Sequence, residues 1–554
     1  MSLPLALLLA GAASAQPLST APIAGASYER RNVFDLSVPE DDLWAFRWAN
    51  RIHMVTQEQV LRRELLLAPG EPYDALKALE TERNLRALGF LRDASVTPVA
   101  RPDGTVDVAV RTQDSWTLTP RASLATEGGQ TTLVYGVSEG NLLGLGKQVS
   151  FFNSSQSTHR RTEVRYGDPR FLRTDARVLG HFADTDRGGE YGLRLARPFF
   201  AHDTPWSAET TWARVAQDEA RYASGVTATE FQHDYRAARG LAAVRLFERA
   251  ETVHRLGAGW RWEHSRFSPL TTTVGGVPAE RQMTGPLAAY ALIEPKYIKA
   301  TDLDRVRVVE DFNLGWELGV EGGPLLEALG SDHDRWGMAA SLQKGLGLGP
   351  GRFALVQAVA DSRAADNGRI ENGVLTGSMN LFWRTPFRFR QTLVAHAEYT
   401  TVKSLDGERQ LNVGGDSGLR GYKNNAFQGA RAAIVNLEDR AFFDANILRL
   451  VHVGAVGFLD AGSAIPQGNP FGRAAWKVDL GAGLRLSSSR SSSGGVLRLD
   501  VAYALNGGPG GSRWVVSLKG GQAFSLAGSA NRPLLRRPDA ILADDSPSER
   551  LRRR

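Results

Sequence analysis

The sequence predicts a mainly β fold, in which a large transmembrane β-barrel follows one small α/β domain. Three observations predict it. The 554-residue chain is rich in glycine, with 58 residues, and contains no cysteine. No later apolar run approaches the roughly 18 residues that a membrane-spanning helix needs. Over most of the chain, apolar and polar residues alternate with a period of two, as they do in the strands of outer-membrane barrels.

The N-terminal residues predict export. Residues 3–9 form a short apolar run, and a small-residue Ala-Ser-Ala sequence ends at Ala15, as in a secretory signal peptide. We therefore expect a signal peptide over residues 1–15 and an irregular leader over residues 16–42. In an exported chain, the lack of cysteine excludes a disulfide framework. The net charge of +6 is small and interspersed, so it does not indicate nucleic acid as a partner.

A small α/β domain is predicted over residues 43–114. Thr56 and Gln59 have the spacing of a helix capping box, and Gly89 follows a second helical pattern, as a helix-ending glycine does. Pro-Asp-Gly at residues 102–104 indicates a hairpin turn. The expected elements are a strand, two helices and two strands, at residues 43–52, 56–67, 73–88, 94–100 and 105–111.

Residues 115–526 are predicted to form the barrel. Leu497, Leu499 and Val501, for example, alternate with polar residues. A soluble sandwich would alternate too, but Trp and Tyr near the strand ends favour a membrane barrel of roughly 16 strands. The first and last strands, near residues 133–137 and 514–524, are expected to meet at the seam. A charged tail over residues 527–554 is expected to be disordered, because of its charge and proline content.

Enzyme-like patterns are incomplete in this sequence. Residues 144–148 resemble part of a phosphate-binding loop, but the first glycine is replaced by Asn141 and no Ser or Thr follows Lys147. The histidines lack the spacing of metal ligands, and no Gly-x-Ser-x-Gly sequence lies between a strand and a helix. The sequence therefore predicts a protein that is not an enzyme and has no metal or other cofactor.

A glycine-rich run over residues 414–422 surrounds Arg420. On the two strands predicted after it, Leu437 and Leu459 suit lipid, which places Glu438 and Asp460 on the face toward the lumen. If the run folds inward, Arg420 can contact both carboxylates, and such pairs are stronger in a confined lumen than on an open surface. If it does not, Arg420 lies on an exposed turn.

Three motifs occur in order along this part of the chain. They are Leu419-Arg420-Gly421-Tyr422, then Asn-Leu-Glu-Asp-Arg containing Glu438, and then Gly-Phe-Leu-Asp-Ala-Gly containing Phe458, Asp460 and Gly462. Together they resemble the signature of the BamA/TamA superfamily of outer-membrane assembly and translocation proteins. In that family the Arg-Gly-Tyr loop folds into the barrel, and its arginine contacts acidic residues of the inner wall. The resemblance implies this role for Arg420, with Glu438 and Asp460 as its partners.

The resemblance also implies how the protein is organised and what it handles. Residues 43–114 resemble one periplasmic POTRA domain, so the chain is expected in the outer membrane of a Gram-negative bacterium. Its expected partners are unfolded or exported polypeptides, outer-membrane lipid and accessory proteins. Three alternatives stay open: a two-partner-type transporter dedicated to one secreted protein, a passive porin and a soluble β-rich enzyme.

Overall fold

The computed structural model describes residues 21–520, apart from residues 128–129, 157–158, 187, 250, 304–305, 386–389, 467, 470–471, 473–475, 492–495 and 510–511. The chain divides into two compact units between Ser115 and Trp116. Three predictions concern residues outside the described ones: the signal peptide, the C-terminal tail and Phe524 at the end of the last predicted strand. No helix among the described residues is long and apolar enough to cross a membrane.

The first unit is a small α/β domain built on a three-stranded sheet. Its elements are β1 (Ile23–Arg31), the 3₁₀ turn η2 (Pro39–Asp41), α1 (Trp44–Ile52), α2 (Glu58–Arg62), α3 (Ala75–Arg86), β2 (Leu91–Ala100) and β3 (Val106–Asp114). The central strand is β3, which pairs in parallel with β1 and antiparallel with β2. Asp74 caps α3 by accepting hydrogen bonds from the backbone N–H groups of Leu76 and Lys77. The core, which includes Leu61, Leu85 and Val108, lies between the helices and the sheet.

The expected leader is partly wrong, because residues 23–31 form β1. Ile23 and Tyr28 are the only large apolar side chains of that strand, so its alternation is weak. Its order comes from the parallel ladder with the buried strand β3, which a local pattern cannot reveal. Thr56 is likewise not a helix cap, since its N–H and hydroxyl donate to Asp114 at 2.7 and 3.0 Å.

The strand expected over residues 43–52 is also wrong, because these residues form α1. The segment is rich in aromatic residues, at 44, 46 and 48, and such residues are common in strands. In the helix, Trp44 and Trp48 share one face and are 82% and 60% exposed. Phe46 lies on the other face, buried and stacked on Phe34 with ring centroids 4.0 Å apart.

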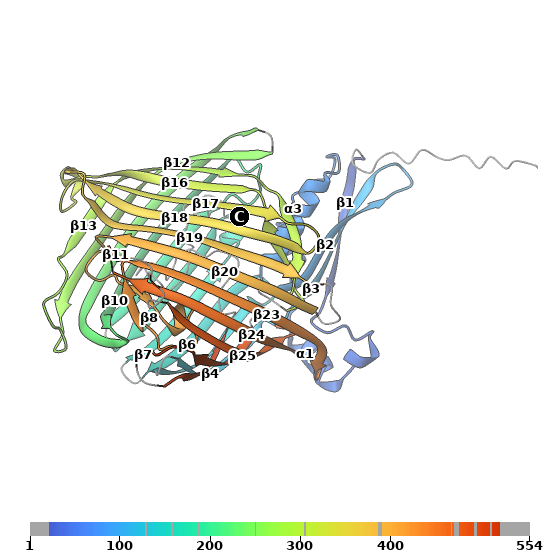
Figure 1. Ribbon diagram of the computed structural model, residues 1–554. Helices are drawn as coiled ribbons and strands as arrows, with labels where there is room; N and C mark the ends of the chain where they lie inside the picture. The colour runs from blue at the N-terminus through green and yellow to red at the C-terminus, as the bar shows by residue number, and fades with distance from the viewer. Residues whose placement is uncertain are drawn as a thin grey trace, which may run out of the picture. The chain divides into compact units, whose positions relative to one another are not determined.

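Within its described residues, the second unit contains a closed barrel of twenty strands. The strands are β4 (Leu118–Glu127), β5 (Gln130–Leu142), β6 (Lys147–Gln156), β7 (His159–Asp168), β8 (Arg177–Thr185), β9 (Gly188–Arg197), β10 (Trp206–Ala223), β11 (Val226–Arg249), β12 (Thr252–Pro269), β13 (Arg281–Ile293), β16 (Trp316–Leu325), β17 (Arg335–Gly347), β18 (Arg352–Ala365), β19 (Ile370–Arg384), β20 (Arg390–Lys403), β23 (Arg431–Ile447), β24 (Val451–Ile465), β25 (Lys477–Ser488), β26 (Val496–Ala504) and β27 (Trp514–Gly520). Figure 1 shows β16 to β20 running side by side in this order. Three 3₁₀ turns lie in the connections, η3 (Phe171–Arg173), η4 (Glu327–Leu329) and η5 (Gly415–Ser417).

The predicted barrel is therefore present, but the expected number of strands is too low. Several connections are only two residues long, such as Ser224 and Gly225 between β10 and β11, so more strands fit into the same length. The expected seam also needs correction, because β27 lies next to β4 and residues 133–137 belong to β5. The sequence of β4 interrupts its alternation with Pro120, which hid the first strand.

Side chains alternate between the outside and the lumen of the barrel. Leu437 and Leu459 point outward and are 45% and 40% exposed. Glu438 and Asp460 point into the lumen and are buried. This arrangement reverses that of the first unit, whose apolar residues are inside, and it matches a barrel surrounded by lipid.

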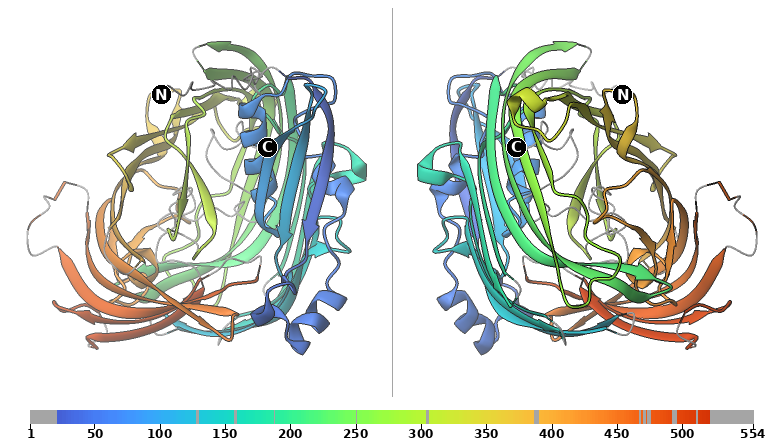
Figure 2. Two further views of the ribbon diagram at one scale, coloured as in Figure 1. Left: turned by 90° about the vertical axis from the view of Figure 1, so that its right-hand side faces the viewer. Right: turned by 90° about the vertical axis from the view of Figure 1, so that its left-hand side faces the viewer.

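Two connections fold into the lumen rather than away from it. We define the near end of the barrel as the end at which β4 begins, and the far end as the opposite one. The lumen loop (residues 404–430) enters from the far end, between β20 and β23, and contains β21 (Leu411–Val413) and β22 (Phe427–Gly429). The near-end hairpin (residues 297–303 and 306–313) lies between β13 and β16 and pairs β14 (Tyr297–Thr301) with β15 (Val309–Asn313). Figure 2 looks along the barrel from its two ends, and connecting segments lie inside the ring of strands.

Candidate functional site in the barrel lumen

The tip of the lumen loop is a compact turn that needs glycine at two positions. The hydroxyl of Ser417 accepts a hydrogen bond from the N–H of Gly414 at 2.7 Å, which closes the turn. Gly418 has a φ of 108°, a left-handed value that glycine adopts without strain. A Cβ at Gly421 would lie 2.5 Å from the Cβ of Asp479 on the barrel wall. The loop therefore approaches the wall as closely as a backbone can.

Arg420 lies between two wall carboxylates. Its Nε and Nη2 donate to the two oxygens of Asp460, each at 2.7 Å, and its Nη1 donates to Oε1 of Glu438 at 2.6 Å. Its backbone N–H also faces Asp460, at 3.3 Å. The guanidinium carbon lies 3.5 Å from the ring centroid of Phe458, so the cation also meets an aromatic face. The Arg420 side chain is 3% exposed, and both carboxylates are fully buried.

Strand register explains why these side chains meet. In the β23–β24 ladder, Asn436 lies opposite Asp460 and Glu438 lies opposite Phe458, so all four share the lumen face. The amide of Asn436 donates to Asp460 Oδ1 and to the carbonyl of Gly418, each at 2.7 Å. Asn436 therefore orients the carboxylate and holds the loop at the same time.

The remaining predicted residues fix the loop beside Arg420. The hydroxyl of Tyr422 lies within hydrogen-bonding distance of the carbonyls of Val478 and Asn506, at 3.1 and 2.9 Å. Leu419 is fully buried, and a Cβ at Gly462 would lie 3.1 Å from its Cδ2. Gly462 thus leaves room for Leu419. The structure brings together all eight residues singled out from the sequence.

Two lumen residues that complete this cluster were not singled out. Arg440 donates from Nε to Oε2 of Glu438 at 2.7 Å and is fully buried. Asp479 lies opposite Asp460 in the β24–β25 ladder and faces the loop at Gly421. A signal existed, since Arg440 has the same strand parity as Glu438. Parity gives the face of a side chain but does not say which residue it contacts.

The other end of the lumen loop is held on the opposite side of the ring. The side-chain amide of Gln410 exchanges two hydrogen bonds of 2.8 Å with the backbone of Tyr222 on β10. Glu408 accepts a hydrogen bond of 2.6 Å from Arg281 on β13. These partners are more than a hundred residues apart in sequence, so no local pattern predicts them. The loop therefore crosses the lumen from β23–β26 to β10–β13.

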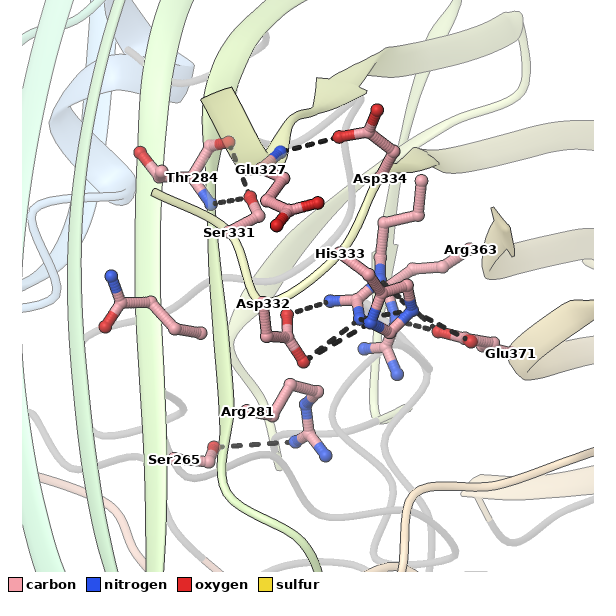
Figure 3. Close-up of polar contacts among 12 residues, drawn as sticks. Ser265, Arg281, Thr284, Glu327, Ser331, Asp332, His333, Asp334, Arg363 and Glu371 are labelled. Carbon is pink, nitrogen blue, oxygen red and sulfur yellow. Dashed lines mark hydrogen bonds and ion pairs between the residues drawn. The ribbon is translucent and has the colours of Figure 1, made fainter. Parts of the chain in front are cut away.

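A charged cluster lies beside this second attachment, and Figure 3 shows its members Asp332, His333, Arg363 and Glu371. Arg363 on β18 pairs with Asp406 of the lumen loop. Glu371, which neighbours Arg363, lies 3.2 Å from His333 Nε2. His333 in turn lies 3.5 Å from Asp332. Because most of these side chains are at least partly buried, the cluster fixes the geometry of the loop more firmly than surface pairs would.

We call the contacts that Arg420 makes with Glu438 and Asp460 the latch of the lumen loop. It contains buried ion pairs and hydrogen bonds between a loop and a wall. Among the described residues, no three His, Asp or Glu side chains gather where they could hold a metal ion. The ion pairs instead hold the loop against the wall, because breaking one of them would leave a buried charge without its partner.

The second unit is a closed membrane-type barrel whose lumen loop is held in place through Arg420. A small α/β domain precedes this barrel in the chain. Residues 53–113 match the family model for POTRA, described as a surface antigen variable number repeat. That match and the barrel confirm the resemblance to the BamA/TamA superfamily, in which a POTRA domain precedes such a barrel.

The fold is similar to those of several solved structures. BamA from Haemophilus ducreyi lacking POTRA domains 1–3 is 12% identical, with a TM-score of 0.36, over 90% of this chain and 84% of that chain. CdiB from Escherichia coli is 13% identical, with a TM-score of 0.48, over 91% and 76%. CdiB from Acinetobacter baumannii is 11% identical, with a TM-score of 0.43, over 91% and 74%. At TM-scores below 0.5 these likenesses carry no weight for the function. No curated protein matches the sequence.

Proposed function

We propose that this protein inserts polypeptides into, or translocates them across, the outer membrane of a Gram-negative bacterium, with its POTRA domain in the periplasm. One observation carries the proposal. A single chain combines a POTRA domain with a barrel whose lumen is crossed by a loop latched at Arg420. A passive porin needs neither the domain nor the latch, and the two lumen crossings argue against free passage of solutes.

The POTRA domain would capture its substrate by adding an extended segment to the edge of its sheet. Within the described residues, β1 and β2 are the edge strands of the three-stranded sheet. Pro98 removes a backbone donor from β2. The edge of β1 beyond Gly25 has no proline, so it offers the longer run of backbone donors and acceptors. We therefore favour β1 as the capture strand.

The role requires no covalent chemistry from the protein. In this proposal the protein is not an enzyme and needs no cofactor. Substrate capture depends on backbone hydrogen bonds, and passage depends on withdrawal of the lumen loop. Outer-membrane lipid is the medium that receives an inserted barrel strand, and accessory proteins in the periplasm can deliver the unfolded chain.

The proposal is tested by depleting the protein and measuring the proteins of the outer membrane and the culture medium. Loss of several outer-membrane proteins supports insertion. Loss of a single large secreted protein indicates a dedicated secretion transporter instead. Purified full-length chain in proteoliposomes, given an urea-unfolded barrel protein, should convert it to a protease-protected form. The proposal is disproved if depletion changes neither the outer-membrane proteins nor the secreted proteins and the purified chain protects no substrate.

A further inference from the structure

The near-end hairpin reaches across the lumen to the strand that carries Glu438. It starts between β13 and β16, whereas the ring order places β17 to β20 between it and β23. Its connecting residues nevertheless contact the β23 side of the wall. Arg307 donates to Asp444 at 2.6 Å, and Asp302 lies 3.7 Å from Arg390 on β20. The hairpin is therefore a second lumen crossing, separate in sequence from the lumen loop.

Apolar contacts hold this hairpin against the wall. Leu303 and Phe312 are buried in one cluster with Phe353, Phe382 and Val394 of β18 to β20. The Phe312 ring centroid lies 5.3 Å from that of Phe353. These wall side chains face the lumen, where polar residues are the rule for membrane barrels. Their apolar character matches that of the hairpin side chains that pack against them.

A polar chain connects the hairpin to the lumen loop. Arg440 donates from Nη1 to the carbonyl of Leu303 at 2.8 Å and from Nε to Oε2 of Glu438 at 2.7 Å. The other oxygen of Glu438 accepts the hydrogen bond from Arg420 at 2.6 Å. Every charged side chain in this chain of contacts is buried. One carboxylate thus joins the two lumen crossings.

We infer that Arg440 is a positioning residue that couples the two crossings, so that withdrawal of the lumen loop at the far end loosens the near-end hairpin. The inference rests on the proposed function, because it describes how a polypeptide path would open. When Arg420 leaves, Glu438 loses the donor on one oxygen, and it shifts toward its remaining partner. Because the two side chains stay paired in the buried site, the Arg440 guanidinium turns as the carboxylate turns, and its Nη1 turns away from the carbonyl of Leu303. That movement breaks the hydrogen bond to Leu303.

The coupling is reciprocal in free energy, so each crossing stabilises the closed state of the other. A path through the barrel would then open at both ends together, and the closed state would block the lumen twice. A lumen loop that acted alone would leave the hairpin seated by its apolar contacts. The two cases differ in a measurable quantity, the accessibility of the hairpin when only the loop is released.

A single cysteine reports that accessibility, because the chain contains none of its own. Ala300 is suitable, since it is small and partly buried against the apolar cluster that seats the hairpin. The full-length Ala300→Cys protein, in proteoliposomes, is labelled with a membrane-impermeant maleimide. Labelling is compared in three backgrounds: Arg420→Ala, Arg440→Met and both together. Circular dichroism and heat-modifiable mobility check that each barrel is folded.

We expect Arg420→Ala to raise the labelling rate by about tenfold or more, since that rate follows the population of the open hairpin. The double variant should label no faster than the faster single variant, because both break the same connection. Arg239→Met is the matched control. It removes another lumen arginine, paired with Glu321 at 2.7 Å, and should leave the rate unchanged.

An unchanged rate in Arg420→Ala, with a raised rate in Arg440→Met, would overturn the coupling, because the hairpin would then be seated independently of the loop. Equal rises in all variants, including Arg239→Met, would also overturn it. The assay needs no substrate, so its outcome is separate from that of the insertion assay. If the proteoliposomes protect no substrate but the labelling rates rise, the proposed function fails and the coupling stands.

Discussion

Both lumen crossings pack apolar side chains against the wall, but they differ in their charged contacts. The lumen loop depends on buried ion pairs of Arg420 and on a glycine-rich backbone that fits closely to the wall. The near-end hairpin rests on apolar packing of Leu303 and Phe312, and its ion pairs with Asp444 and Arg390 are partly exposed. Ion pairs require one geometry and fail when one partner is removed, whereas apolar packing tolerates rearrangement. The loop is thus suited to one fixed docked position. The hairpin can shift in small steps while its apolar side chains stay packed.

The largest effect is expected from Arg420→Ala. Removing one member of a buried ion pair typically costs about 3–5 kcal/mol, because the carboxylates stay buried without a partner. The loop should leave the lumen while the barrel stays folded in the membrane, and the function should be impaired. Protease cleavage within residues 404–430 and the insertion assay measure the two effects. Wild-type activity in this variant would remove the role assigned to Arg420.

Arg420→Lys separates charge from geometry. Lysine keeps the charge but cannot donate to Asp460 and Glu438 together in a fork, so an intermediate defect is expected. Double-mutant cycles of Arg420→Ala with Glu438→Ala and with Asp460→Ala should give coupling energies of about 0.5–3 kcal/mol. Independent effects in both cycles would show that the contacts do not operate in the working protein.

A smaller and different effect is expected when the hairpin seat is weakened. Leu303→Ala removes a buried side chain and should destabilise the seated hairpin by about 2–4 kcal/mol. Because the lumen loop remains latched, the leak should be partial, seen as more frequent brief openings in planar-bilayer conductance. Val356→Ala is the control, since Val356 lies on the outer face of β18 and is 40% exposed. Equal leaks from both variants would contradict the proposed seat.

The difference between the two crossings also explains what the sequence could predict. Strand parity predicts that Glu438 and Asp460 face the lumen, since both alternate with outward-facing leucines over two long strands, and the family resemblance implied their contacts with Arg420. The near-end hairpin has no such signal. Its five-residue strands are too short for the roughly 9–11 residues that cross a bilayer, yet they resemble barrel strands in composition. Its partners lie many strands away, and alternation does not encode distance around the ring.

The first unit shows the same limit on a smaller scale. Three aromatic residues suggested a strand, whereas the helix α1 places Trp44 and Trp48 four residues apart on one face. β1 escaped notice because its stability comes from pairing with β3. Sequence patterns thus identified the elements with long, regular alternation. They missed the elements whose conformation is decided by a partner elsewhere in the chain.

A moderate effect is expected from Gly421→Ala. The added Cβ would lie 2.5 Å from the Cβ of Asp479, so either the loop or β25 must shift, at a cost of about 1–3 kcal/mol. Gly457→Ala is the matched control, because no atom lies within 4 Å of a Cβ placed there. Protease cleavage of the lumen loop should rise in the first variant and not in the second. Equal cleavage would mean that the close approach does not stabilise the latch.

The smallest effect is expected from Tyr422→Phe, which keeps the buried ring and removes only its hydroxyl. That hydroxyl lies within reach of the carbonyls of Val478 and Asn506, so its loss should weaken loop docking by about 1 kcal/mol. The change should raise loop cleavage in mild urea about fivefold without altering the folding of the barrel. A loss as large as that of Arg420→Ala would place the latch at the tyrosine instead. The lumen loop and the near-end hairpin would then no longer differ through buried ion pairs, because a neutral hydrogen bond would hold the loop.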